Sequence, residues 1–446
     1  MQPDLPRAAR PAELLVRAGV VVTMDGARRV IEDGAVAVAD GEIIAVGRAG
    51  EVAAAHPGAR LLDAGGDLLM PGLVDGHTHL AMTLFRGLAD DLPLQDWLER
   101  HVWPAERRVL RTETVRWGSR LGAAELVRSG VTTCCDMYFF ADEVAAAVED
   151  VGMRAIVARA YVEGAGPALD RELAEAEAFA GRWRGHARIT PALGPHAPYT
   201  VGPDAYRALH ALAGRLDVPM ATHLAETRDE ASAVTDPRGP TPVRHLDALG
   251  VLDERLVAAH CVWVDDEDIA LLAARGTGVV HCPRSNLKLA SGVAPVPDML
   301  AAGVHVGLGT DGAASNNALD LVAEMQTAAL VHKGVRLDPL AVPAAEAVTM
   351  ATIGGARALG MDGLVGSLEP GKRADMVVVG LDDDRLTPLY DPVSHLAYAA
   401  AAADVRTVLV DGRVVMEDRR LLTVDEAEVR ARVRGMAREI ATPRRP

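Results

Sequence analysis

Strand-like apolar runs alternate along this chain with stretches of helical periodicity, such as 113–129 and 204–216. This alternation is typical of consecutive βα units that form a parallel sheet. The candidate strands are eight in number: 72–79, 131–138, 155–161, 189–196, 219–223, 256–260, 278–281 and 304–311. Eight such units predict an α/β fold of the TIM type, a closed (β/α)8 barrel whose active site lies at the C-terminal ends of the strands.

Both ends of the chain show a different pattern, in which short runs rich in Val and Ile are separated by turn residues such as Asp40-Gly41. Runs of this kind occur at 14–22, 35–39 and 43–46, and again at 374–381, 405–409 and 413–416. We expect the two ends to build one small β-sandwich domain beside the barrel. The predicted boundaries are 14–70 with 365–425 for the sandwich, 71–364 for the catalytic barrel, and 426–446 for a C-terminal helix and tail.

Two histidines, His77 and His79, stand at the end of the first predicted barrel strand. Successive side chains of a strand point to opposite faces, so residues two apart point the same way. Two imidazoles on one face can bind one metal ion. Taken alone, the pair fits an exposed strand face equally well, because short motifs carry a false-positive risk.

Further polar residues stand at the ends of later strands: His223, Glu226 three residues beyond it, His260 and Asp311. Each alone fits a core or turn residue. A barrel brings the carboxyl ends of its strands together, and the set as a whole therefore predicts a convergent site.

Three imidazoles and one carboxylate, from His77, His79, His223 and Asp311, suit a divalent metal ion of the zinc type with a position left for water. Zinc is the first choice, with Fe²⁺ and Mn²⁺ as alternatives. Bound zinc lowers the pKa of its water from about 15.7 to about 7. We expect Glu226 to deliver a proton to the substrate, while His260 and Asp311 orient and deprotonate the water.

One metal ion fits this sequence better than two. Barrel hydrolases with two metal ions commonly bridge them with a carboxylated lysine at the end of the fourth strand. That position carries His196 here, and the chain contains only three lysines, Lys288, Lys333 and Lys372.

The formal net charge of −16 argues against a nucleic-acid polymer as partner, because that affinity comes from clustered Lys and Arg. No apolar run approaches the length of a membrane span, and residues 1–17 lack the apolar core of a secretory signal. We therefore expect a cytoplasmic protein that acts on a small molecule without a membrane partner. Whether it forms a homo-oligomer is left open.

Several motifs of the chain resemble the amidohydrolase superfamily, and within it most closely the 5-methylthioadenosine/S-adenosylhomocysteine deaminases. The resemblance extends from Leu14 to about Arg432. The motifs are Pro71-Gly72-Leu73 leading into His77-Thr78-His79, Thr222-His223-Leu224-Ala225-Glu226-Thr227, Ala259-His260-Cys261-Val262, Ser285-Asn286-Leu287-Lys288-Leu289, and Gly309-Thr310-Asp311-Gly312. This resemblance implies hydrolytic deamination of a purine nucleoside, with release of ammonia.

The same resemblance implies roles for residues outside the metal site. Glu106, in Trp103-Pro104-Ala105-Glu106, matches a residue that binds the two ribose hydroxyls, and His196 matches one that hydrogen-bonds a purine nitrogen. Glu226 also contacts the purine. Arg159 matches the residue that receives the carboxylate of the homocysteine end, while a second family arginine has only an uncertain counterpart in Arg171.

Two alternative functions remain at this point. A deaminase of guanine-type bases or a triazine hydrolase uses the same metal site, but its substrate has no ribose diol for Glu106 to bind. A non-catalytic binding protein built on the same barrel normally loses metal ligands, whereas all four positions are present here.

Overall fold

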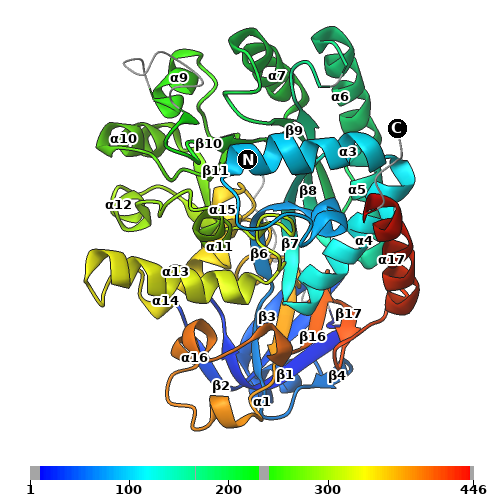
Figure 1. The fold of residues 1–446 in the computed structure, drawn as a ribbon. Coiled ribbons are helices and arrows are strands. Elements are labelled where there is room, and N and C mark those ends of the chain that lie inside the picture. Colours follow the sequence, from blue (N-terminus) through cyan, green and yellow to red (C-terminus); the bar gives the residue numbers. More distant parts are fainter. Residues whose placement is uncertain (1–10, 166, 231–240, 442–446) are drawn as a thin grey trace, which may run out of the picture.

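The computed structural model describes residues 11–165, 167–230 and 241–441. The predicted tail at 442–446 lies outside these ranges. Figure 1 shows a barrel surrounded by helices in the upper part of the molecule and a separate β-sheet below it. Among the described helices, none combines the length and apolarity needed to cross a membrane.

The barrel consists of eight strands, and every pairing between neighbours is parallel. Pairing of Leu308 with Asp75 closes the ring between the last strand and the first. The strands are β6 (Leu73–His79), β7 (Val131–Tyr138), β8 (Arg154–Tyr161), β9 (Ile189–Pro195), β10 (Met220–Leu224), β11 (Leu256–His260), β12 (Gly278–His281) and β13 (Val306–Leu308). The predicted (β/α)8 barrel is confirmed.

Helices cover the outside of the barrel (Figure 1) and bury the apolar residues of the outer strand faces in one large cluster. Their boundaries follow local signals; for example, α10 begins at a capping box formed by Asp265 and Asp268 and ends at Gly276 with φ 69°. The main covering helices are α4 (Thr112–Arg128), α5 (Ala141–Val151), α6 (Leu169–Trp183), α7 (Pro203–Leu216), α9 (Pro242–Ala248), α10 (Asp266–Arg275), α12 (Val296–Ala301), α13 (Leu321–Arg336) and α14 (Ala344–Met350).

A short helix, α15 (Ile353–Ala358), closes the end of the barrel where the strands begin. Its Ile353 and Ala356 join Val74 and Val257 in the cluster that fills the barrel interior. Glycine is required beneath this helix, because a Cβ on Gly278 would lie 1.9 Å from the carbonyl oxygen of Ala358. Since α15 closes this end of the barrel, a functional site has room only at the opposite end, where the strands end.

The two ends of the chain meet in one nine-stranded sheet, through antiparallel pairing of β5 with β15. The sheet returns on itself, since backbone hydrogen bonds of 2.8 Å join Ile43 to both Gly371 and Lys372, and one side of it encloses an apolar cluster. The composite domain predicted from both chain ends is confirmed. Its strands are β1 (Leu14–Val22), β2 (Val30–Ala39), β3 (Glu42–Arg48), β4 (Arg60–Asp63), β5 (Leu68–Pro71), β15 (Met376–Val379), β16 (Val405–Val410), β17 (Arg413–Glu417) and β18 (Arg420–Leu421). The predicted domain boundaries stay a prediction.

A buried ion-pair cluster joins this sheet to the barrel. The guanidinium of Arg154, at the start of β8, donates to Asp375 at 3.0 Å and to Asp411 at 2.6 Å, and all three residues are buried. The two parts are therefore joined by charge as well as by apolar contact.

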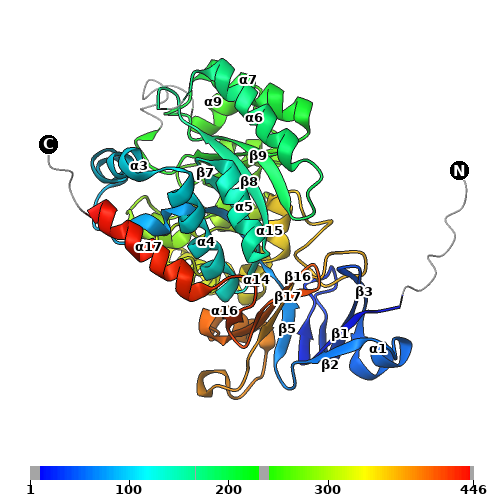
Figure 2. The same ribbon diagram turned by 90° about the vertical axis from the view of Figure 1, so that its right-hand side faces the viewer.

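The segment between β6 and α4 folds over the open end of the barrel. It contains η1 (Leu80–Phe85), α2 (Leu94–Trp97), the π-helical turn η2 (Leu98–Val102) and α3 (Trp103–Val109). The C-terminal helix α17 (Glu426–Ala441) packs on α4 and contacts α3 (Figure 2). This arrangement supplies a roof for the site below.

Candidate active site

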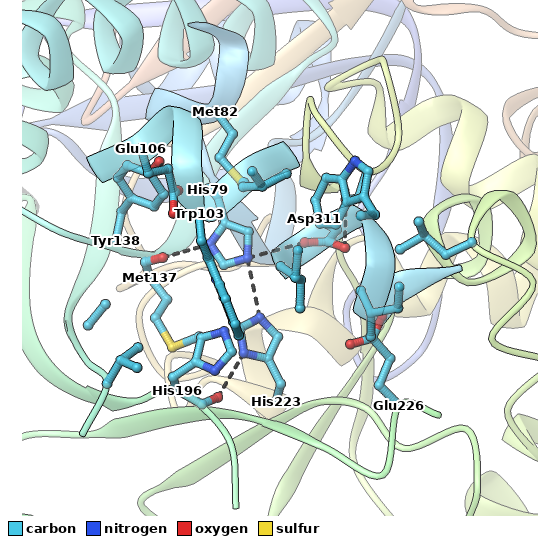
Figure 3. Close-up of a pocket in the computed structure, with 18 of the residues that line it drawn as sticks. His79, Met82, Trp103, Glu106, Met137, Tyr138, His196, His223, Glu226 and Asp311 are labelled. Atoms are coloured by element: carbon cyan, nitrogen blue, oxygen red, sulfur yellow. Dashed lines mark hydrogen bonds and ion pairs between the residues drawn. The ribbon is translucent and has the colours of Figure 1, made fainter. Parts of the chain in front are cut away.

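A pocket lies at the C-terminal ends of the barrel strands and contains most of the polar residues named from the sequence (Figure 3). Its floor is formed by residues at the strand ends, including His79, His223 and Asp311. Its roof comes from α2, η2 and α3, with Trp97, Trp103 and Glu106 among the lining residues. A small molecule in this pocket is thus enclosed by the barrel and the roof segment.

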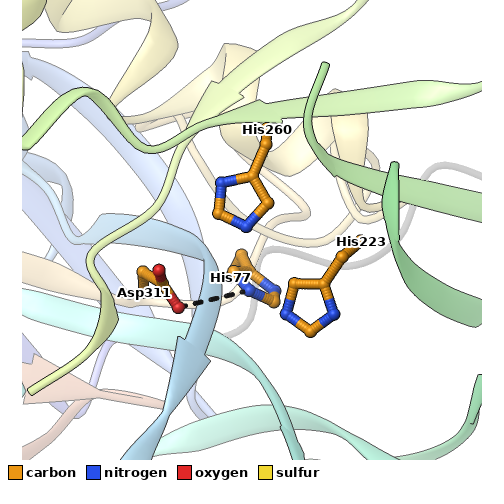
Figure 4. A group of neighbouring side chains, drawn as sticks. All are labelled: His77, His223, His260 and Asp311. Carbon is orange, nitrogen blue, oxygen red and sulfur yellow. Dashed lines mark ion pairs between the residues drawn. The ribbon is translucent and has the colours of Figure 1, made fainter. Parts of the chain in front are cut away.

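Four side chains at the C-terminal ends of the barrel strands, His77, His223, His260 and Asp311, form a group that can hold a metal ion (Figure 4). They come from β6, β10, β11 and β14 (Asp311–Gly312), so only the closed barrel brings them together. Their ligand atoms all lie within 4.8 Å of one another, and all four residues are buried.

His79 lies beside this group. Its Nε2 is 3.2 Å from Oδ1 of Asp311 and 3.3 Å from Nε2 of His223. The ligand set predicted from the sequence contains His79 where this group contains His260. The residues of the predicted set therefore also lie close together. The structure brings together five donors around one point, and His260 was expected there in a different role.

The donors suit a divalent metal ion. The Nε2 atom of His77 is buried and has no hydrogen-bond partner among the described residues. In His79 and His223, Nδ1 lies 2.6 Å and 2.8 Å from the carbonyl oxygens of Met137 and His196. Since a neutral imidazole that donates from Nδ1 has its lone pair on Nε2, both rings present a ligand nitrogen to the pocket.

Asp311 is held by three donors. Its Oδ2 accepts from Ser285 at 2.6 Å and from Ser315 at 2.8 Å, and its Oδ1 accepts from the backbone N–H of Gly312 at 2.7 Å. Burial opposes ionisation, but the facing imidazoles of His77 and His79 hold the pKa of Asp311 well below its usual value. A carboxylate in this state is an anionic metal ligand. Sequence reasoning missed the role of Ser285 and assigned Ser315 no function.

The backbone at the site is strained. His260 and Asp311 have φ of 77° and 56°, and Ala225, next to Glu226, has φ of 52°. Residues with a Cβ avoid this region, and each such conformation costs about 1–3 kcal/mol. Three such residues around one pocket are typical of a functional site, where the surrounding fold maintains the strain.

His260 differs from the other imidazoles in its partners. Its Nδ1 lies 3.1 Å from Nδ2 of Asn286, which can only donate, so the ring proton is on Nε2. That Nε2 is 3.7 Å from Oε2 of Glu226. Burial lowers the pKa of His260 to about 3, so the neutral ring faces the carboxyl group. His260 therefore adjoins both the other residues of the metal group and Glu226.

Glu226 follows β10 and is buried in the pocket. Burial, reinforced by the negative charges of Asp311 and Glu230, raises its pKa well above the usual value. Its backbone N–H donates to the buried carboxylate of Glu230 at 2.7 Å, which anchors the turn. A protonated carboxyl group in this place can give a proton to a bound molecule.

Glu106 and His196 line other walls of the same pocket. Burial raises the pKa of Glu106 to about 7, and its Oε1 accepts a hydrogen bond from the hydroxyl of Tyr138. His196 pairs through Nδ1 with the hydroxyl of Thr200 at 2.9 Å, and burial, together with the charges of His79 and His77, lowers its pKa to about 3. Sequence reasoning did not identify Tyr138.

Arg159 lies outside the pocket that Glu106 and His196 line. Its guanidinium donates to Glu172 at 2.6 Å and 3.0 Å and to Glu175 at 2.6 Å, and the residue is not among those that line the pocket. Arg171 is exposed and pairs with Glu175 at 2.8 Å. The predicted contact of Arg159 with a substrate carboxylate stays a prediction, and the structure gives this residue two carboxylate partners of its own.

Comparison with known proteins agrees with this geometry. A sequence profile of the amidohydrolase family matches residues 68–415. A protein of Syntrophobacter fumaroxidans named 5-methylthioadenosine/S-adenosylhomocysteine deaminase is 49% identical over 96% of this chain and 98% of its own length. Among solved structures, an adenosine deaminase from Xanthomonas campestris with bound zinc has a TM-score of 0.93 and 40% identity, covering 98% of this chain and 100% of the other. The atrazine chlorohydrolase of Arthrobacter aurescens in complex with zinc has a TM-score of 0.87 and 26% identity, covering 95% and 100%.

Proposed function

This chain belongs to the amidohydrolase family, and we propose that it is a metal-dependent deaminase that releases ammonia from adenosine derivatives substituted at the 5′ position. 5-Methylthioadenosine and S-adenosylhomocysteine are the substrates in question. The observation that carries the proposal is the position of Glu106, a buried carboxylate in the wall of the pocket that contains the metal group. The name of the Syntrophobacter relative supports the same substrates.

A divalent ion, with zinc as first choice, supplies Lewis-acid activation of a water molecule when it is bound. We propose that His77, His79, His223 and Asp311 hold it. The carbonyl partners of His79 and His223 and the two serines at Asp311 orient these ligands, and such outer partners typically change affinity or activity 10–100-fold when removed.

His260 then has the role of orienting the attacking water, together with Asp311. Its proton on Nε2 and its distance to Glu226 support this role over that of a ligand. Asp311 accepts the proton that the water loses.

Glu226 delivers a proton to the substrate. Glu226 is buried, and a carboxyl group whose pKa is raised by burial stays protonated until the substrate is bound. It donates to a ring nitrogen as the water oxygen attacks the carbon that bears the amino group. The proton accepted by Asp311 then passes to the amino group, and the C–N bond breaks to release ammonia. The remaining hydroxyl proton returns to Glu226 as the carbonyl of the product forms.

Glu106 selects the nucleoside. Its Oε1 is oriented by Tyr138, and an ionised carboxylate has further acceptor sites for two hydroxyl donors. His196, which lines the same pocket, contacts the purine. A free base or a triazine has no ribose diol, so the acceptor sites of buried Glu106 that Tyr138 does not fill would stay unpaired, which is costly.

The test is ammonia release from a panel of adenosine, 5-methylthioadenosine, S-adenosylhomocysteine, adenine, guanine and an aminotriazine by the zinc-loaded protein. We expect the substituted nucleosides to have the highest kcat/KM. A higher value for guanine or the triazine would show that the alternative substrate class is correct. Absence of turnover with bound metal would favour the non-catalytic barrel. Location in the cytoplasm stays a prediction, and homo-oligomer formation stays open.

A further inference from the structure

A buried carboxyl group on α13 takes no part in the proposed mechanism. Glu324 belongs to the first turn of this helix, its side chain is fully buried, and it is not among the residues that line the active-site pocket. Burial of such a group is costly unless other groups of the protein pair with it. The partners of Glu324 therefore indicate what it does.

One oxygen of this carboxyl group holds a short helix, α11 (Pro283–Lys288). Oε2 of Glu324 accepts the backbone N–H of Arg284 at 3.0 Å. Nε of the same arginine lies 3.6 Å from Oε1, which adds an ion pair. The first turn of α11 is therefore fixed to α13 through Glu324.

The next two residues of α11 reach the metal site. The hydroxyl of Ser285 donates to Oδ2 of Asp311 at 2.6 Å. Nδ2 of Asn286 donates to Nδ1 of His260 at 3.1 Å. Because Ser285 and Asn286 are both buried, their positions depend on where the helix is held. A shift of α11 would displace both donors together.

The other oxygen of the carboxyl group holds the loop that follows β14. Oε1 of Glu324 accepts a hydrogen bond from Nδ2 of Asn316 at 2.7 Å, and the same amide donates to the backbone carbonyl of Thr310 at 2.7 Å. Ser315, directly before Asn316, supplies the second hydroxyl to Oδ2 of Asp311, at 2.8 Å. The loop is therefore anchored beside the metal ligand that it follows.

The two anchored segments also contact each other, since Nε of Arg284 donates to Oδ1 of Asn316 at 3.3 Å. Among the described residues, the hydrogen bonds and the ion pair of the Glu324 side chain go only to these two partners. Its contacts thus serve the junction between α11 and the loop after β14.

We propose that Glu324 is a positioning residue for the metal site and acts through the two segments that it joins. It sets the separation of α11 from the loop after β14, and thereby the geometry of both serine donors to Asp311 and of the amide donor to His260. The inference rests on the proposed function, in which Asp311 binds the metal ion and His260 orients the water.

The substitution Glu324→Gln tests this role with little change in size. Each carboxyl oxygen of Glu324 accepts a hydrogen bond from one segment, whereas the amide of Gln has only one acceptor oxygen and can hold one segment but not both. Competition with a fluorescent chelator measures the zinc affinity. Asp268→Asn is the matched control, because Asp268 is equally buried in the first turn of α10 and does not line the pocket.

We expect Glu324→Gln to weaken zinc binding about tenfold, and the control to bind zinc within about twofold of the unmodified protein. The same substitution in the background of Ser285→Ala with Ser315→Ala should weaken zinc binding less than about threefold, because the two donors through which it acts are already absent. Equal factors in both backgrounds would show that Glu324 does not act through the serines, and would overturn the inference.

Kinetics at saturating zinc provide a second readout. Glu324→Gln should lower kcat for 5-methylthioadenosine about tenfold and leave KM within about twofold, because Glu324 acts on Asp311 and His260 and does not line the substrate pocket. A higher KM with unchanged kcat would contradict a role at the metal site.

A second variant covers the case in which Glu324→Gln does not fold. Asn316→Ala removes the link from Glu324 to the loop and leaves the contact with Arg284 in place. It should weaken zinc binding by a similar factor of about ten. If folded Asn316→Ala binds zinc as tightly as Asp268→Asn does, the inference is wrong.

Failure of the proposed function has a different signature. If the unmodified protein binds no zinc, both proposals fall. If it binds zinc but releases ammonia from none of the nucleosides, the proposed function falls, and the zinc titrations still decide the role of Glu324. If it deaminates 5-methylthioadenosine while Glu324→Gln matches Asp268→Asn in zinc affinity and kcat, only the inference about Glu324 is wrong.

Discussion

The backbone carbonyl of His196 accepts a hydrogen bond from Nδ1 of His223 at 2.8 Å. The end of β9 thereby sets the tautomer of a ring at the end of β10, and Nε2 of His223 is left facing the metal site. The same residue, His196, lines the pocket with its own ring. One position thus serves both the metal site and the substrate wall.

We expect one transition-metal ion per chain. The donor atoms of His77, His223, His260 and Asp311 converge within 4.8 Å, and His79 adjoins them. Chelation should abolish ammonia release, and zinc should restore it. Elemental analysis of the active protein provides the count, and a value of two per chain would contradict the prediction.

Glu226→Gln should retain near-normal metal content and lower kcat by at least about 10²-fold, the lower end for a positioned acid–base group. The amide has the same size but cannot deliver the proton. Steady-state ammonia release measures the effect, with zinc content as the control. Turnover near that of the unmodified protein would show that another residue carries the proton.

Removal of both serine donors to Asp311, in the double variant Ser285→Ala with Ser315→Ala, should weaken zinc binding about 10–100-fold. The reason is that Oδ2 of Asp311 then loses both side-chain hydrogen bonds. Competition with a fluorescent chelator measures the affinity. Ser394→Ala is the control, since Ser394 lies on α16 (Pro392–Tyr398), away from the pocket. Equal zinc affinity in both proteins would argue against a role for the serines.

The KM for nucleosides should rise as the pH falls below about 7. Burial raises the pKa of Glu106 to about 7, and a protonated carboxyl group has lost acceptor capacity for the ribose hydroxyls. Glu106→Gln should have a high KM that no longer varies with pH in this range. Initial rates measured from about pH 5.5 to about pH 8.5, in steps of about half a unit, test this. If the KM of the variant varied with pH as that of the unmodified protein does, the prediction would be refuted.

Arg154→Met should lower the free energy of unfolding by about 3–5 kcal/mol, because it leaves the buried carboxylate of Asp375 without its guanidinium partner and leaves Asp411 with Arg373 as its close guanidinium partner. Arg17→Met, which removes an exposed ion pair with Asp33, is the control and should cost about 0–1 kcal/mol. Urea denaturation measures both.

The pH dependence of this cluster has a defined sign. Although burial opposes it, the guanidinium groups of Arg154 and Arg373 lower the pKa of Asp411. The stabilisation is therefore present above the unfolded pKa of about 3.9 and is lost as the pH falls through the lower folded value. Arg154→Met should show less acid-induced loss of stability than the unmodified protein.

Local periodicity alone was enough to predict the barrel and the placement of His77, His79, His223, His260, Glu226 and Asp311 at strand ends. The physical reason is that a buried parallel strand is recognisable as a short apolar run, and barrel closure brings every strand's carboxyl end to one side. The union of the two chain ends in one sheet followed from the same kind of pattern.

Contacts between side chains from different elements were decided only by the tertiary structure. Ser285 and Tyr138 orient Asp311 and Glu106 because α11 (Pro283–Lys288) and β7 place them there. The same holds for Arg159, whose partners Glu172 and Glu175 lie on α6, and for Glu324, whose partners lie on α11 and in the loop after β14. The sequence determined which residues carry charge and which elements carry them. Which charges neutralise one another, and which are left to meet a substrate, depended on the packing of helices onto the barrel, because an ion pair forms only between atoms that the fold brings within a few ångströms.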